Sequence, residues 1–148
     1  MNNDFFEIDV NKLYEKAKRD VLIFIRAPIE DHLFNALFAL YHLREWIYPD
    51  GYESYKNKNL NDMTSNEHFH NNLHTNPDYV IIRQLCNRAK HVKVDSTSFE
   101  TNLKQGLIPG YARAGDSLGQ KVFLVENRDV RTVMENVLEE YNSYFNMQ

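Results

Sequence analysis

One short stretch of the sequence gathers side chains that could act on a phosphate. Within little more than one helical turn, QLCNRAKHVKVD holds an amide and three potential cations: Asn87, Arg88, Lys90 and His91. An imidazole can serve as a general acid or base, and a lysine or arginine can stabilise developing charge on a phosphate. As an enzyme, the chain would be a metal-independent ribonuclease that uses His91 as the acid or base and Lys90 or Arg88 to stabilise the phosphate.

The same stretch has a structural interpretation. Cations in the last turn of a helix are favoured by the helix dipole, by roughly 0.3 to 1 kcal/mol each. Arg88, Lys90 and His91 would then form a solvated helix end, and the stretch would carry no catalysis.

A second group of polar residues lies on a segment that otherwise looks buried. It consists of three residues at spacings of seven and four: Asn35, His42 and Trp46. An unsatisfied buried polar group costs roughly 1 to 3 kcal/mol, so these side chains need partners. If the two segments pack together, the expected partners of Asn35 and His42 are Asn87, Lys90 or His91. This predicts a polar network between two helices, which either binds a ligand or only fixes the helix register.

The elements that position these residues are predicted to be mainly helical. Apolar residues at three- and four-residue spacing predict four helices, at residues 10–26, 28–47, 77–91 and 128–145. Asp9 is the expected cap of the first helix and Asn127 that of the last. A glycine-rich region predicts a β-hairpin with strands at residues 107–112 and 121–125. The polar segment 51–76 is expected to be a long loop with a short helix near residues 65–73.

Length, charge and cysteine content bound the class of protein. The 148 residues predict a single domain, 1–148, and a net charge of −4 predicts no general attraction to nucleic acid. The single cysteine, Cys86, is expected to be a buried thiol in a reducing, cytoplasmic setting. The acidic N-terminus does not resemble a signal peptide, and the longest apolar region is too interrupted to span a membrane.

The histidines of the polar segment raise the question of a metal. His70 and His74 are four residues apart and could share a helix face as ligands, with His68 and Glu67 nearby. No further ligand pair has a suitable spacing elsewhere, so neither a metal nor another cofactor is expected.

Two of these segments carry a resemblance to a known superfamily. ALFALYHLREWIYPDG resembles a helix of uncharacterised small bacterial proteins at four positions: Ala39, His42, Leu43 and Trp46. IIRQLCNRAKHVKVD is similar to their N-x-x-K-H helix end at Asn87, Lys90 and His91. Those proteins in turn resemble the HEPN superfamily of helical bundles. The likeness covers most of the chain, including the hairpin and the final helix.

The resemblance implies a HEPN-like bundle of about four helices with a β-hairpin before the last helix. HEPN proteins include metal-independent ribonucleases, toxins of toxin–antitoxin pairs and non-catalytic binding modules, and they commonly form dimers. The implied setting is therefore RNA or nucleotide binding, or defence against phage, by a homodimer.

The nuclease motif of the superfamily is absent in its usual form. Active HEPN nucleases resemble one another in an arginine followed four to six residues later by a histidine. Here Arg88 is too close to His91 and Arg83 is too far from it. The pair Arg26 and His32 has the right count, but Pro28 lies between them, so the two side chains need not share a face.

These observations favour a non-catalytic binding or regulatory protein. The residues expected to bind a ligand or form the network are Asn35, His42, Trp46, Asn87, Arg88, Lys90 and His91. The first alternative is the ribonuclease. The second is an inhibitor or antitoxin that binds a partner protein through its acidic surface and the tyrosine-rich loop from Tyr48 to Tyr55.

Overall fold

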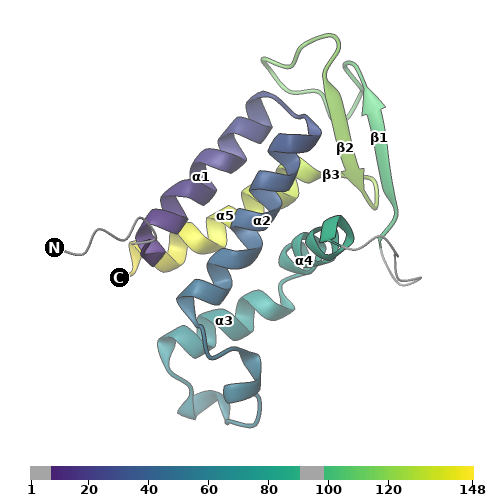
Figure 1. The fold of residues 1–148 in the computed structure, drawn as a ribbon. Helices are drawn as coiled ribbons and strands as arrows, with labels where there is room; N and C mark the ends of the chain where they lie inside the picture. The colour runs from purple at the N-terminus through teal and green to yellow at the C-terminus, as the bar shows by residue number, and fades with distance from the viewer. Residues whose placement is uncertain (1–7, 91–98) are drawn as a thin grey trace, which may run out of the picture.

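The computed structural model describes residues 8–90 and 99–148, so the predictions that concern His91 lie outside the described residues. The described part is mainly helical and carries a small antiparallel sheet at one end (Figure 1). Its five α-helices are α1 (Val10–Arg26), α2 (Glu30–Ile47), α3 (Ser65–Thr75), α4 (Pro77–Lys90) and α5 (Val130–Asn146). None of these helices is long and apolar enough to cross a membrane.

The core lies where α1, α2 and α5 pack together, with α4 packed against α2 and α5 (Figure 1). The α1 helix has the predicted bounds and the predicted cap, because the Asp9 carboxylate accepts a hydrogen bond of 2.8 Å from the Lys12 amide. At the centre, the Tyr141 hydroxyl donates a hydrogen bond of 2.6 Å to the Leu40 carbonyl oxygen, and both residues are fully buried. The prediction that Cys86 is a buried thiol is confirmed.

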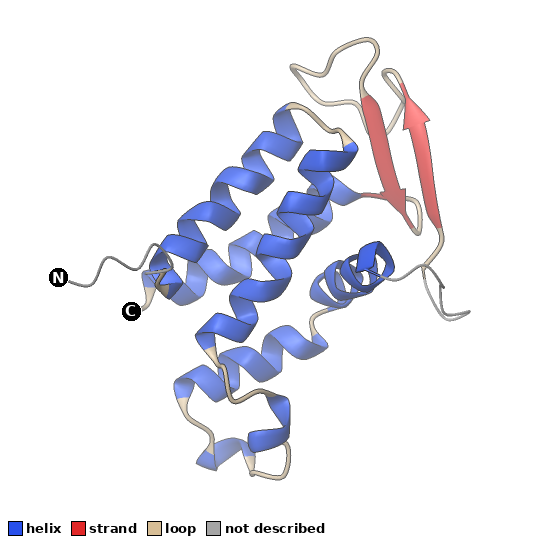
Figure 2. Ribbon diagram, viewed as in Figure 1, coloured by secondary structure: helices blue, strands red, loops and turns tan. Residues whose placement is uncertain are grey.

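The sheet is formed partly by a segment that the sequence did not indicate. Its strands β1 (Thr101–Gln105), β2 (Lys121–Val125) and β3 (Arg128–Asp129) follow the order β1-β2-β3 (Figure 2). The β2 strand has the predicted bounds, but the prediction of a strand at residues 107–112 is wrong. That segment contains Pro109 and Gly110, which favour turns. All five residues of the β1 strand, TNLKQ, are exposed and four of them are polar, so its pairing with β2 decides its structure.

The start of α5 also differs from the prediction. Asn127 does not cap the helix. It lies with Glu126 in the left-handed region, at φ 60° and 48°, in the turn between β2 and β3. The cap is Asp129, whose carboxylate accepts a hydrogen bond of 2.9 Å from the Arg131 amide.

Residues 51–76 form an ordered lobe beside the end of α2. Two short 3₁₀ turns, η1 (Tyr52–Ser54) and η2 (Leu60–Asp62), precede α3, which confirms the predicted short helix and extends it to Thr75. Thr64 and Glu67 form a capping box at the start of α3. The lobe is therefore held by specific contacts, although few of its residues are apolar.

Candidate functional site

Two arginines are buried in the described part of the protein, and they have different surroundings. Arg131 has a relative exposure of 2% and forms ion pairs of 2.8 Å with both Asp116 and Asp129. Its charge is thus compensated twice, and the cluster ties the loop before β2 to the start of α5. We assign Arg131 a structural role.

Arg44 is buried without such compensation. It lies near the end of α2 with a relative exposure of 8%. Its Nε donates a hydrogen bond of 3.1 Å to the carbonyl oxygen of His70, and its Nη2 donates one of 3.0 Å to His70 Nδ1. No carboxylate of residues 8–90 or 99–148 forms an ion pair with Arg44. The guanidinium also lies 5.5 Å from the ring centroid of Tyr79, a cation–π contact that leaves it without a counter-anion. Because a buried charge without a counter-ion costs several kcal/mol, Arg44 is suited to an external anion.

The contact with Arg44 fixes the protonation of His70. A guanidinium only donates, so His70 Nδ1 must accept, and the proton of the neutral ring is on Nε2. The Tyr55 hydroxyl donates to the same Nδ1. Burial, and then the charge of Arg44, lower the pKa of His70 to about 4. His70 is therefore neutral near pH 7 and adds no charge beside the arginine.

A second arginine–histidine contact follows one helical turn later on α3. Arg83 Nη1 donates a hydrogen bond of 3.2 Å to His74 Nδ1. The pKa of His74 is lowered as well, first by burial and then by the charges of Arg44 and Arg83. The His74 ring stacks on Tyr52, with centroids 4.8 Å apart and planes at 9°. The neutral imidazole thus packs flat against the Tyr52 ring.

Arg44, His70 and Tyr52 border a cavity of about 550 Å³ between the end of α2 and the lobe of residues 51–76. Its lining combines a buried arginine and histidine with aromatic rings: Arg44, Glu45, Trp46, Tyr48, Pro49, Gly51, Tyr52 and His70. Glu45 is the acidic residue of this lining, and its carboxylate accepts a hydrogen bond of 2.8 Å from His42 Nδ1. The volume is in the range of small-molecule sites, roughly 300 to 1,000 Å³.

The buried carboxylate of Glu67 holds Tyr48, one of the residues that line the cavity, in place. It accepts hydrogen bonds from the Tyr48 hydroxyl at 3.0 Å and from Lys58 Nζ at 2.8 Å. The bond from Lys58 is the main cause that lowers the pKa of Glu67, so this group is charged near pH 7. Tyr48 is thereby oriented, and the segment that carries Tyr52 is fixed against α3.

The stripe of polar residues on α2 does not lie where the sequence predicted. Asn35 is exposed, Trp46 has a relative exposure of 47%, and His42 is bonded to Glu45 on its own helix. At about 100° per residue, these three positions lie on the side of α2 opposite to its buried leucines. The prediction of a buried stripe is therefore wrong. Trp46 nevertheless lines part of the cavity that Arg44 also borders.

The polar residues of α4 are also separated from that stripe. Asn87 and Lys90 are exposed, and no hydrogen bond within the described ranges joins either of them to Asn35 or His42. Lys90 Nζ instead lies 4.7 Å from the ring centroid of Tyr41. His91 lies outside the described residues.

Arg88 joins α4 to the sheet. Its Nη1 donates hydrogen bonds of 3.1 Å to the Phe99 carbonyl oxygen and of 3.1 Å to Thr101 Oγ1. Arg88 is therefore held at the sheet, and it does not line the cavity that Arg44 borders.

Sequence reasoning missed Arg44 and the role of His70 beside the arginine, whereas Tyr55 belongs to the tyrosine-rich loop that was predicted only as a surface for a partner protein. Arg44 carried a usable signal, because a charge on the buried face of a helix is rare without a reason. His70 and His74 were considered only as metal ligands. In the described part of the chain, no group of three or more potential ligands is close enough to hold a metal ion.

The chain matches no protein-family model, no curated protein and no solved structure.

Proposed function

We propose that this protein is a non-catalytic binding protein whose ligand carries a phosphate next to a planar base. The observation that carries the proposal is the buried Arg44, which has no carboxylate partner among the described residues and lines a cavity. A phosphate group would supply the missing charge. Arginine is well suited to this role because its planar guanidinium donates to phosphate oxygens.

The aromatic lining argues for a base beside that phosphate. Trp46, Tyr48 and Tyr52 border the same cavity as Arg44. Bases stack on aromatic side chains, and such stacking contributes about 1 to 3 kcal/mol per base. The cavity volume of about 550 Å³ suits one nucleotide, either free or at the end of an RNA strand.

The chemistry of His70 favours binding over cleavage. A general acid or base works best when its pKa is near the operating pH. The pKa of His70 is lowered to about 4, and its Nδ1 is already occupied by Arg44 and Tyr55. The pair resembles a nuclease arginine–histidine pair in composition, but the histidine is held in one neutral form.

The wider setting of the proposal rests on the sequence resemblance. We propose that the bundle is HEPN-like, that the protein works in the cytoplasm and that it belongs to a bacterial or phage defence context. The support is the motif at Ala39, His42, Leu43 and Trp46, of which Trp46 borders the proposed site.

Fluorescence of Trp46 tests the proposal directly, since it is the one tryptophan of the chain. Titration with AMP should quench or shift this emission, whereas adenosine should bind at least about tenfold more weakly because it lacks the phosphate. A 5′-phosphorylated RNA tetranucleotide distinguishes an RNA end from a free nucleotide by binding more tightly than AMP. Equal affinities for AMP and adenosine, or no change with either, would contradict the proposal.

A further inference from the structure

The β1 strand has an unpaired outer edge. In the described sheet it is a terminal strand, paired only with β2, and all five of its residues are exposed. Such an edge presents backbone donors and acceptors that can pair with another strand. Its sequence, TNLKQ, has a leucine at its centre, and Leu103 has a relative exposure of 50%.

The hydrogen bonds to β2 show which groups of β1 point outward. Gly106 N donates to Gln120 O at 2.8 Å, and Glu126 N donates to Glu100 O at 2.9 Å. Both pairs belong to the register that sets Thr101 opposite Val125. Because bonded pairs alternate along an antiparallel ladder, the even-numbered residues face β2. The N–H and C=O groups of residues 101, 103 and 105 therefore face away from the sheet.

We propose that a second copy of this chain pairs with this edge, antiparallel and centred on Leu103. The three outward-facing residues then meet in bonded pairs, Leu103 with the second Leu103 and Thr101 with the second Gln105. Lys104 lies opposite Asn102, so no like charges oppose each other, and all five residues of each strand are used.

Neighbouring registers fit less well. A pairing centred on Lys104 would set two lysines directly opposite each other, which is destabilising. A pairing centred on Asn102 would require the Phe99 carbonyl oxygen to accept from the second strand. That oxygen already accepts a hydrogen bond of 3.1 Å from Arg88. The register centred on Leu103 avoids both conflicts.

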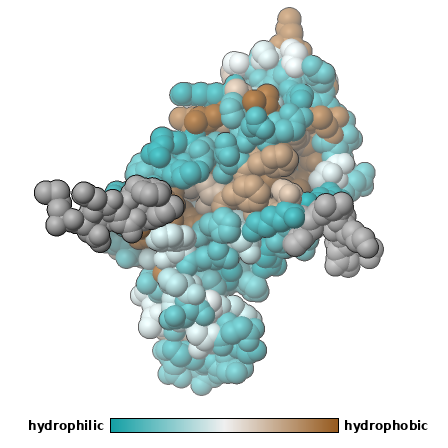
Figure 3. Space-filling view, viewed as in Figure 1, coloured by the Kyte–Doolittle hydropathy of each residue, from teal (hydrophilic) through white to brown (hydrophobic). Residues whose placement is uncertain are grey.

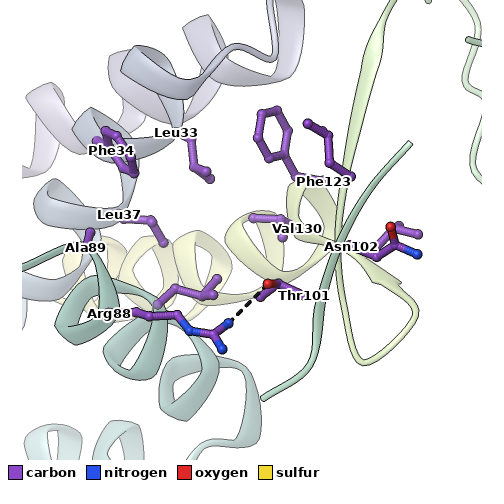
Figure 4. Close-up of a pocket in the computed structure, with 12 residues that line it drawn as sticks. Leu33, Phe34, Leu37, Arg88, Ala89, Thr101, Asn102, Phe123 and Val130 are labelled. Atoms are coloured by element: carbon purple, nitrogen blue, oxygen red, sulfur yellow. Dashed lines mark hydrogen bonds between the residues drawn. The ribbon is translucent and has the colours of Figure 1, made fainter. Parts of the chain in front are cut away.

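An apolar cavity next to β1 supports the same occupant. It has a volume of about 490 Å³, lies between α2, α4 and the sheet, and is lined by residues that include Leu33, Phe34, Leu103 and Phe123. Figure 4 shows Phe123 directed toward the helices and Asn102 directed away from the cavity. Figure 3 shows apolar surface over α2 on this side, whereas the lobe of residues 51–76 is mainly hydrophilic.

In the proposed dimer, the two-fold symmetry of the strand pairing brings the apolar cavities of the two copies next to each other. Directly opposite residues of an antiparallel pair point to the same face of the sheet. The two Leu103 side chains would thus meet on the face that carries Phe123, the residue of β2 directly opposite Leu103. Each covers apolar surface of the other copy, including Phe34, which has a relative exposure of 41%. The interface is small, so we expect a dimer that dissociates at about 1 to 100 µM.

This inference is independent of the proposed nucleotide site. That cavity lies at the end of α2 near Arg44, whereas Phe34 and Leu33 lie at its beginning. Loss of dimerisation with intact nucleotide binding, or the reverse, separates the two proposals.

Sedimentation equilibrium over about 1 to 200 µM tests the oligomeric state. Wild type and Leu60→Lys, which changes an exposed leucine of η2, should both form dimers. Leu103→Lys should be monomeric throughout, because it sets two lysines together. A monomeric wild type, or a dimer that survives Leu103→Lys, would overturn the proposal.

Cysteine cross-linking tests the register in the folded protein. The native Cys86 is buried, so an introduced cysteine would supply the reactive thiol. Opposite residues of a bonded pair have Cα atoms about 5.5 Å apart, within the range for a disulfide. Mild oxidation should link Leu103→Cys to itself, and Thr101→Cys only when mixed with Gln105→Cys. Efficient homodimers of Thr101→Cys alone would contradict this register.

Discussion

Nη2 of Arg44 donates a hydrogen bond of 3.0 Å to Nδ1 of His70, and both residues are buried. The contact joins the last turn of α2 to α3, and it sets a charged group beside a neutral one. Since the arginine cannot accept a proton, any titration of this pair belongs to the histidine. Protonation of His70 would therefore change both the stability of the fold and the charge of the cavity, because both depend on its contact with Arg44.

The pKa of His70 predicts how stability depends on pH. Its pKa is lowered from the ordinary value of 6.5 to about 4. Between these values the unfolded chain binds a proton that the folded chain does not, so stability falls as pH falls from about 6.5 to 4. We expect a loss on the order of 2 to 3 kcal/mol, measured by urea unfolding at a series of pH values.

The substitution His70→Asn should weaken that dependence, because the amide oxygen can accept from Arg44 without titrating. His68→Asn is the matched control on the same helix and should keep the full slope. A residual slope is expected from His74, whose pKa is also lowered. If His70→Asn and wild type lost stability equally with falling pH, the assignment to His70 would be wrong.

The two aspartates around Arg131 predict a large cost for removing that arginine. Arg131→Met would leave the carboxylates of Asp116 and Asp129 without their counter-ion. Removing one partner of a buried ion pair costs roughly 3 to 5 kcal/mol. Arg128→Met is the control, since Arg128 pairs with Asp78 but its side chain is 41% exposed, and it should cost about 1 kcal/mol or less. Urea unfolding measures both. Equal losses for the two variants would refute the structural role of Arg131.

The hydroxyl of Tyr55 is predicted to hold the segment around η1 against α3. Tyr55→Phe removes its donation to His70 while leaving the buried ring in place, at a cost of about 1 kcal/mol. Amide hydrogen exchange in residues 51–58 should accelerate. Tyr111→Phe, which removes a hydrogen bond to the Asn127 carbonyl oxygen, should leave exchange there unchanged. Unchanged exchange in Tyr55→Phe would show that other contacts hold the segment.

The helices could be predicted from sequence because their apolar periods are strong. The α1 helix and β2 have the predicted bounds, since each carries a regular pattern and clear ends. The β1 strand could not be predicted, because TNLKQ has neither an apolar alternation nor β-branched residues beyond Thr101. Its structure depends on the neighbouring strand, which is distant in sequence.

The candidate site could not be predicted from sequence, because it depends on contacts between segments that are far apart in the chain. Arg44 and His70 are 26 residues apart and meet only because the lobe folds back on α2. The stripe of Asn35, His42 and Trp46 is predicted to be buried because the aromatic residues around it make the helix apolar on most sides. In the structure it lies opposite the buried leucines instead. Of these three residues, Trp46 borders the cavity.

Isothermal titration of AMP into wild type and Arg44→Gln tests the central claim most directly. Glutamine keeps a donor beside His70 but removes the charge, and Arg19→Gln, on the exposed face of α1, is the matched control. We predict that Arg44→Gln binds AMP at least about tenfold more weakly, with binding to Arg19→Gln unchanged and all three proteins folded by circular dichroism. An equal affinity of wild type and Arg44→Gln for AMP, or no binding by wild type, would contradict the account.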